Sequence, residues 1–184
     1  MIIDAICSSK FITAKKSKEL IEKLEGFHGY KLTNRIRLNS ELSNFIACVM
    51  RIRGRNNRRD YPSVMLVYAN DAREAGILLE SFAGEDYVYI RDSALSQPDT
   101  GARIESVDAM EATCKEFDRV VMLLDETFYY DEDGYLRSID TVKDDRVRNV
   151  YHGLGRAKKK IALIVKENGQ VFDGILDVLQ KRDL

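Results

Sequence analysis

Short apolar runs alternate with segments of helical periodicity along most of this chain, and this alternation limits the fold more than any other feature. The runs SVMLVY (63–68), RVVMLLD (119–125) and KIALIVK (160–166) are apolar almost throughout, as strands buried on both faces are. Amphipathic segments separate them. Such alternation predicts right-handed βαβ units. The expected fold class is therefore α/β, a mostly parallel sheet flanked by helices.

Weaker patterns complete the expected order of elements. Asp71 and Glu74 have the spacing of a capping box at the start of one helix. Asn39 has the character of an N-cap for another, which ends near Gly54. Further short strands are expected over 30–33, 85–90 and 103–110, and further helices over 14–25, 75–82, 141–160 and 170–181.

Composition limits the class of protein. A chain of 184 residues allows one domain or two very small ones, and its 45% hydrophobic content excludes a disordered chain. The net charge of −1 means that any nucleic-acid contact must come from a local patch. No apolar run is long enough to span a bilayer, so no membrane partner is expected. We expect a single soluble, cytoplasmic domain over 1–184, with 1–28 as a leading helix and linker.

The cysteines and histidines do not form a metal-binding pattern. Cys7, Cys48 and Cys114 are an odd count without ligand-like spacing, which favours reduced thiols in a cytoplasm. His28 and His152 lie far from any of them, so no metal site is expected. The DEDG segment (131–134) has its Gly too early for a calcium loop and is expected to be an acidic hairpin turn.

No nucleotide-binding loop of a known kind is present in these residues. Neither GxxxxGK[ST] nor GxGxxG occurs, and the GxG of Gly153 and Gly155 precedes a strand instead of following one. In open parallel sheets, function gathers at the loops that leave the carboxyl ends of strands. The loops expected to carry function are therefore 34–40, 69–71, 108–118 and 125–140, together with the approach to the helix at 146–157.

Three polar segments stand next to predicted buried elements and carry charged residues in a recognisable order. The first is LTNRIRLNSELSNFI (32–46), with Arg35 and Arg37 between a short strand and a capped helix. The second is DAMEATCKEFDRVVMLLD (108–125), a polar stretch that includes Glu116, Phe117 and Asp118 and leads into a buried strand. The third is VRNVYHGLGRAKKKIALIV (147–165), with Arg156 near a helix end just before a buried strand.

Together these segments resemble motifs IV, V and VI of the C-terminal RecA-like domain of superfamily 1 helicases of the UvrD/Rep-like family. The positions that match motif IV are Leu32, Thr33, Arg37, Asn39, Glu41 and Leu42, with Ile36 in place of an aromatic residue. The positions that match motif VI are Tyr151, Gly153, Leu154, Arg156, Ala157 and Lys158. Their order and the intervening strands also agree, so the resemblance covers the chain from about residue 30.

The resemblance implies a RecA-like domain without its own P-loop. In that family ATP and Mg²⁺ are bound mainly by an N-terminal RecA-like domain of the same protein, and the second domain supplies arginines to the γ-phosphate. Arg37 and Arg156 match those arginines, Glu116 matches a carboxylate that binds the ribose, and residues 108–114 would lie near single-stranded DNA. The resemblance thus implies an ATP-dependent DNA helicase of which this chain is one part, inactive when isolated.

Three positions depart from the family pattern. Cys114 stands where motif V has Gly, and a Cβ narrows the backbone freedom that glycine provides. Met110 stands near a usual His or Thr. Gly155 replaces a Thr or Ser in a predicted helix, where it costs about 1 kcal/mol relative to Ala and so needs a packing reason. These departures support an alternative, a degenerate helicase-like module that binds nucleic acid or a protein without catalysis.

Other interpretations of the same residues stay open at this point. Arg156 can complement a helix C-terminus, Arg37 can pair with Glu41, and Glu116 can be a solvated loop carboxylate. A flavodoxin-like signalling domain explains the alternating elements but not the three ordered motifs.

Two surface segments have alternatives of their own. The arginine-rich run after the first predicted buried helix has the charge of a phosphate-binding patch, but no aromatic residues interleave with it, which favours a solvated surface. Its members are Arg51, Arg53, Arg55, Arg58 and Arg59. The aromatic residues of 128–135 stand beside carboxylates that repel DNA, so they are expected to form a hairpin flap. Lys158, Lys159 and Lys160 are expected to form a solvated turn.

Overall fold

A computed structural model describes residues 40–54, 60–92, 104–139 and 146–180. The chain divides into two compact units, Met1–Ile36 and Arg37–Leu184, and all of the described residues belong to the second. The helix expected over 14–25, the strand expected over 30–33 and the Asn39 cap lie outside the described residues.

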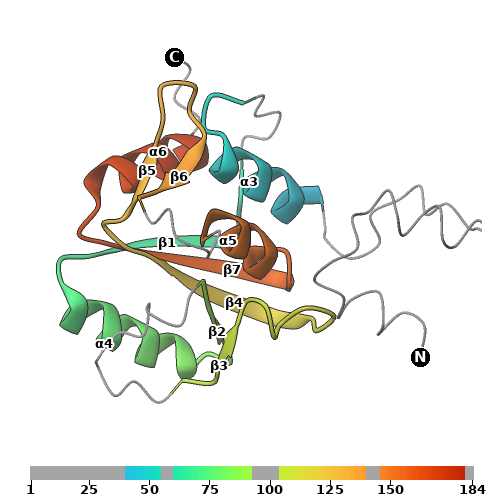
Figure 1. The fold of residues 1–184 in the computed structure, drawn as a ribbon. Coiled ribbons are helices and arrows are strands. Elements are labelled where there is room, and N and C mark those ends of the chain that lie inside the picture. The colour runs from blue at the N-terminus through green and yellow to red at the C-terminus, as the bar shows by residue number, and fades with distance from the viewer. Residues whose placement is uncertain (1–39, 55–59, 93–103, 140–145, 181–184) are drawn as a thin grey trace, which may run out of the picture. The chain divides into compact units, whose positions relative to one another are not determined.

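Five strands form a parallel sheet. They are β1 (Val64–Ala69), β2 (Val88–Arg91), β3 (Ser106–Asp108), β4 (Phe117–Leu124) and β7 (Ala157–Lys166). Their order across the sheet is β1-β7-β4-β2-β3, and every neighbouring pair is parallel (Figure 1). The predicted α/β class, a parallel sheet flanked by helices, is confirmed, and it is consistent with a RecA-like domain.

The strand order excludes the flavodoxin-like interpretation. In flavodoxin-like sheets the first and third strands of the chain are neighbours. Among the strands of the described residues, the first, β1, lies beside the last, β7, while the third, β3, lies at the opposite edge of the sheet.

Helices cover both faces of the sheet. Helix α4 (Ala72–Ala83) packs on one face, where its Leu79 and Phe82 join Val121 and Ile164 in a smaller core. The other face is covered by α3 (Ser40–Met50), α5 (Arg146–Leu154) and α6 (Gly169–Gln180), whose apolar stripes form the larger core. Figure 1 shows α4 below the sheet and the other three helices above it. None of the helices in the described ranges is long and apolar enough to cross a bilayer.

Three of the sequence expectations are wrong in detail. Strand β1 is not buried on both faces, because it pairs only with β7 within the described sheet and leaves Met65 exposed. The helix expected over 141–160 ends at Leu154, and Lys158, Lys159 and Lys160 do not form a turn but are exposed residues of β7. A charged start to a buried strand obscured this boundary in the sequence.

A two-stranded hairpin follows β4, as expected for the acidic turn. Strands β5 (Phe128–Tyr130) and β6 (Leu136–Ser138) pair in antiparallel register. In the turn, Asp131 accepts hydrogen bonds from the backbone N–H groups of Asp133 (3.1 Å) and Tyr135 (2.8 Å), and Gly134 adopts a φ of 78°. The carboxylate of Asp131 thus organises the turn from within.

The predicted capping box of α4 is half confirmed. The side chain of Asp71 accepts a hydrogen bond from the Glu74 N–H at 2.7 Å, as an N-cap does. The Glu74 carboxylate accepts a hydrogen bond from the Asn70 N–H at 2.7 Å, whereas a capping box predicts a bond from the N–H one residue later. The helix therefore begins where the sequence predicts, but the second bond of the capping box reaches one residue further back.

The Asp71→Ala variant removes the cap acceptor without touching the core, because Asp71 is exposed. We expect its free energy of unfolding to fall by about 1 kcal/mol, while Asp71→Ser, which keeps an acceptor oxygen, loses only a few tenths. Urea denaturation measures both. Equal losses in the two variants would contradict the assignment of Asp71 as the cap.

Candidate functional site

Arg156 lies in the turn between α5 and β7, next to the start of β4. Its backbone carbonyl accepts a hydrogen bond from the Phe117 N–H at 2.9 Å, and its Nε donates to the carbonyl of His152 at 3.3 Å. The second of these bonds is the helix-end interaction weighed from the sequence. Among the described residues no carboxylate pairs with Arg156, so its charge is not neutralised there.

The Phe117–Arg156 bond brings Glu116 to the same edge of the sheet as Arg156. Glu116 is exposed and directly precedes β4, whereas Arg156 directly precedes β7. Asp118 reinforces the contact, since its carboxylate lies 2.7 Å from the Lys159 Nζ and 3.5 Å from the Lys158 Nζ. The hydrogen bond from Lys159 is the main cause of the lowered pKa of Asp118.

Glu41, in the first turn of α3, bonds this helix to Ser63, just before β1. This buried carboxylate accepts hydrogen bonds from the Ser63 N–H at 2.7 Å and the Ser63 Oγ at 3.1 Å. The Ser63 carbonyl in turn accepts from the Ile161 N–H at 3.0 Å. Helix α3 therefore begins beside the amino end of β1, at the level of Ile161 in the middle of β7, a link that no sequence pattern indicated. Arg37 itself lies outside the described residues.

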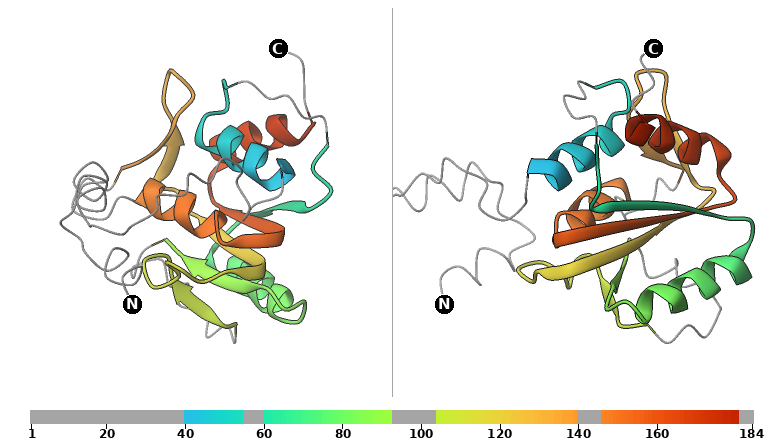
Figure 2. Two further views of the ribbon diagram at one scale, coloured as in Figure 1. Left: turned by 90° about the vertical axis from the view of Figure 1, so that its right-hand side faces the viewer. Right: turned by 180° about the vertical axis from the view of Figure 1, so that it is seen from behind.

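Segments far apart in the sequence thus meet at the amino-terminal edge of the sheet. Figure 1 shows the starts of α3, β4 and β7 at the same end of the sheet, and the left view in Figure 2 looks onto that end. The general rule for parallel sheets predicted the opposite, carboxyl edge. Of the loops expected to carry function, 69–71 and the described part of 125–140 follow strand ends at the carboxyl edge, away from Arg156 and Glu116. Segment 108–118 returns from the end of β3 to the start of β4.

The departure at Cys114 coincides with a backbone conformation that glycine favours. Cys114 has a φ of 71°, in the left-handed region, and its side chain is exposed. The residues before it form tight turns, with the Ala112 N–H donating to the Asp108 carbonyl at 2.8 Å. The sequence expectation that a Cβ is unfavourable here agrees with this geometry, because a non-glycine residue costs about 1–2 kcal/mol in that region.

The packing reason expected for Gly155 applies instead to Gly153. Gly155 lies one residue beyond the end of the helix, where its N–H donates to the Tyr151 carbonyl at 3.1 Å, so it bears no mid-helix cost. Gly153 has the packing reason instead. A Cβ there would come within 2.6 Å of the Met122 Sδ and 3.0 Å of the Ile90 Cγ2. The absence of a side chain lets α5 lie close on β4 and β2.

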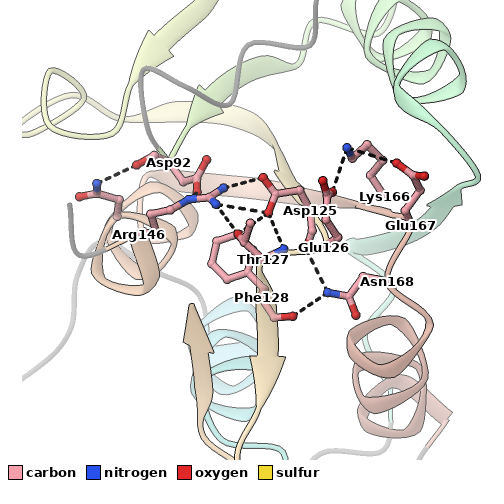
Figure 3. A network of polar contacts seen from close by, with 10 residues as sticks. Asp92, Asp125, Glu126, Thr127, Phe128, Arg146, Lys166, Glu167 and Asn168 are labelled. Atoms are coloured by element: carbon pink, nitrogen blue, oxygen red, sulfur yellow. Dashed lines mark hydrogen bonds and ion pairs between the residues drawn. The ribbon is translucent and has the colours of Figure 1, made fainter. Parts of the chain in front are cut away.

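A buried ion-pair network at the carboxyl edge was missed by the sequence analysis. Figure 3 shows Arg146, the first described residue of α5, between Asp92, which follows β2, and Asp125, which follows β4. Arg146 donates to Asp92 at 2.6 Å and to Asp125 at 2.8 Å, and also to the Thr127 hydroxyl. The guanidinium lies over the Phe128 ring at 4.6 Å from its centroid. A carboxylate directly after each of two adjacent strands was the available signal.

Hydrogen bonding and ion pairing outweigh burial in their effect on the pKa values of Asp125 and Arg146. The side chains of Arg146 and Asp92 are only 5% and 1% exposed. Burial alone would raise the pKa of Asp125, but hydrogen bonds from Arg146 and Thr127 hold it below its ordinary value. Likewise, burial opposes the charge of Arg146, yet its two aspartate partners raise its pKa. The charged forms of Asp125 and Arg146 are therefore favoured, and the ion pairs hold the start of α5 at the carboxyl edge.

Comparison with known proteins adds little to this description. No family model and no curated protein matches the chain. Among solved structures, the chain is similar to the C-terminal domain of a possible DNA helicase from Lactobacillus plantarum WCFS1, at 12% identity and a TM-score of 0.44, covering 77% of this chain and 97% of that one. A similarity at that level does not establish a common fold or activity.

Substitutions at Cys114 separate backbone strain from the chemistry of the thiol. We expect Cys114→Gly to be as stable as the unchanged chain or more stable by up to about 1 kcal/mol, because relief of strain outweighs the entropy of glycine. Cys114→Val is expected to be clearly less stable, since a branched side chain fits a φ of 71° poorly. Cys114→Ala, with a Cβ but no sulfur, is the control. Denaturation midpoints measure the stability of each variant. Equal stability of the Gly and Val variants would contradict the proposed backbone strain at Cys114.

Removal of one partner tests the buried network. Arg146→Ala leaves Asp92 buried without its cation, so we expect about 3–5 kcal/mol loss of unfolding free energy. Because the folded pKa of Asp125 is lowered, its contribution is complete above its unfolded pKa of about 3.9 and is lost as the pH falls further. Asp125→Asn should therefore flatten the acid limb of the stability curve.

Urea titrations between neutral and acid pH measure how the free energy of unfolding depends on pH. Asp118→Asn removes the exposed ion pairs to Lys158 and Lys159 and is the matched control, with a much smaller expected loss because solvent screens exposed pairs. An unchanged acid limb in Asp125→Asn would overturn the assignment.

Proposed function

We propose that this chain is the second RecA-like motor domain of an ATP-dependent superfamily 1 DNA helicase or translocase. One observation carries the proposal. The described parts of three segments that resemble motifs IV, V and VI lie on the side of the sheet where its strands start: Glu41 is bonded to Ser63, just before β1, and Phe117 of β4 is bonded to Arg156, just before β7. A shared edge is what a composite nucleotide site requires.

In this proposal Arg156 serves the chemistry of the γ-phosphate. The transition state of phosphoryl transfer spreads negative charge over its oxygens, and guanidinium groups stabilise that charge bidentately. The Nε of Arg156 is used at the end of α5, which fixes the side chain and leaves its Nη groups as donors. Arg37, three residues before α3 in the sequence, is proposed as the second cation.

The remaining parts of the nucleotide site are divided between two domains. Glu116 is proposed to accept a hydrogen bond from the ribose hydroxyl. ATP and Mg²⁺ are proposed to be held mainly by an N-terminal RecA-like domain, because this edge offers guanidinium donors and the sequence has no phosphate-binding loop. The isolated chain is therefore expected to show no ATP hydrolysis. Single-stranded DNA is proposed to pass near residues 108–114.

A second candidate is a degenerate module that binds nucleic acid or a protein without catalysis. It is favoured by Cys114, which keeps a strained backbone where motif V has Gly, and by the exposed Met110 close to it. The module differs from the motor in one respect that can be measured: in the module, Arg156 has no part in ATP hydrolysis.

The decisive measurement is DNA-stimulated ATP hydrolysis by the protein in which this chain is joined to its ATP-binding domain. We expect Arg156→Ala to lower kcat by about 10³-fold or more, with little change in ATP binding, since an arginine of this kind acts in the transition state. Arg156→Lys should recover only part of the rate, because lysine lacks the bidentate donors.

Arg119→Ala is the control for a general loss of positive charge. Arg119 lies on β4 near the same edge and donates to the Glu85 carbonyl at 2.6 Å, outside the proposed site. Its variant should keep full turnover. Equal turnover in the Arg156→Ala and unchanged proteins would reject the motor and favour the module.

A further inference from the structure

The outer face of the β5–β6 hairpin presents planar side chains to solvent. Strand residues alternate, so that Phe128, Tyr130 and Leu136 point into the core, whereas Tyr129 and Arg137, which are opposite each other in register, point outward. Tyr129 and Tyr135 remain 39% and 38% exposed. Arg51, just after α3, joins this face through a bridge to Tyr135. We call Arg51, Tyr129, Tyr135 and Arg137 the hairpin face.

Two guanidinium groups lie close to the ring of Tyr135, which stays partly exposed. The Arg51 guanidinium carbon lies 4.5 Å from the ring centroid and that of Arg137 lies 5.5 Å from it. Planar cations and aromatic rings therefore follow one another along the hairpin face. Such an arrangement suits bases, which stack on aromatic rings and on guanidinium planes.

The hairpin face is preorganised by contacts at its base. The Ile52 N–H donates to the Gly134 carbonyl at 2.9 Å, and the guanidinium of Arg53 donates to the Glu132 carbonyl. A Cβ on Gly134 would come within 2.8 Å of the Arg53 Cγ, so this close approach depends on glycine. On the inner side, the buried Tyr130 hydroxyl donates to the Val49 carbonyl at 2.9 Å. The face is thus tied to the end of α3.

The fold removes the objection raised from the sequence to a phosphate-binding patch. Aromatic residues do not interleave with the arginines along the chain, but the hairpin places Tyr135 against Arg51 in space. The carboxylate of Asp131 is neutralised by Arg137 at 2.8 Å, whereas no carboxylate of the described residues pairs with Arg51 or Arg53. Glu132 and Asp133, exposed at the turn, remain as opposing charges.

We propose that the hairpin face binds single-stranded nucleic acid, with a base stacked on Tyr135 and the adjacent phosphate held by Arg51. This inference deepens the proposed function, because it gives the motor a strand contact on the hairpin, outside the three motifs. It needs neither ATP nor the ATP-binding domain. Its failure can therefore be told apart from the failure of the Arg156 assignment.

The test is binding of a fluorescein-labelled oligothymidine to the 184-residue chain, followed by fluorescence anisotropy at low salt. We expect Tyr135→Ala to weaken binding about five- to one-hundred-fold, since stacking contributes about 1–3 kcal/mol per base. Tyr135→Phe, which keeps the ring, should bind as the unchanged chain does. Arg51→Ala should weaken binding and reduce its salt dependence.

Two further variants guard against misfolding as an explanation. Glu132→Gln with Asp133→Asn leaves the stacking residues intact and should tighten binding, because two repelling charges are removed. Arg73→Ala, an exposed arginine of α4 on the opposite face of the sheet, is the matched control and should leave binding nearly unchanged. The proposal is overturned if the chain does not bind, if Tyr135→Ala binds as tightly as Tyr135→Phe, or if neutralising the turn does not tighten binding.

Discussion

The parallel pairing of β4 with β7 is the interaction on which the rest of this structure depends. The two strands pair from Phe117 and Ala157 to Leu124 and Val165, at the centre of the sheet, and their side chains supply both cores. The same pairing begins with the Phe117–Arg156 hydrogen bond. That bond joins the backbones of Phe117 and Arg156, directly before a register shift between Phe117 and Arg119, and so keeps Glu116 near Arg156.

Helix α5 joins the two edges of the sheet. At its start, Arg146 is held by Asp92 and Asp125 at the carboxyl edge, and at its end the chain turns through Gly155 into β7. Gly153 lets the helix lie close on β4 and β2 between these points. The orientation of Arg156 is therefore determined by packing along the whole helix. A buried ion-pair network is an effective anchor for this purpose, because separating its partners strongly destabilises the fold.

The sequence predicts the class of the fold well, because buried parallel strands and amphipathic helices have different periods. It places β4, β7, α4 and α6 to within a few residues. It fails where tertiary context decides. The charged residues 158–160 belong to a strand that is exposed only at its start, and β1 is half exposed because it is an edge strand in the described sheet.

The candidate site can be predicted only in part from the sequence. Local patterns single out Glu116 and Arg156, but the edge at which they meet follows from strand order, which no local pattern encodes. The Glu41–Ser63 link, the Arg146 network and the contact between Arg51 and Tyr135 all join residues from separate elements. Their spacing in the sequence carries no period that could reveal them.

We propose that the amino edge of the sheet faces the γ-phosphate of a nucleotide held by another domain. Amide hydrogen exchange of the protein that contains both domains, measured with and without ADP and aluminium fluoride, shows which edge the nucleotide contacts. We expect slower exchange in the segments around Phe117 and Arg156 when the transition-state mimic is bound. Protection confined to the carboxyl edge, around Asp125 and Asn168, would contradict it.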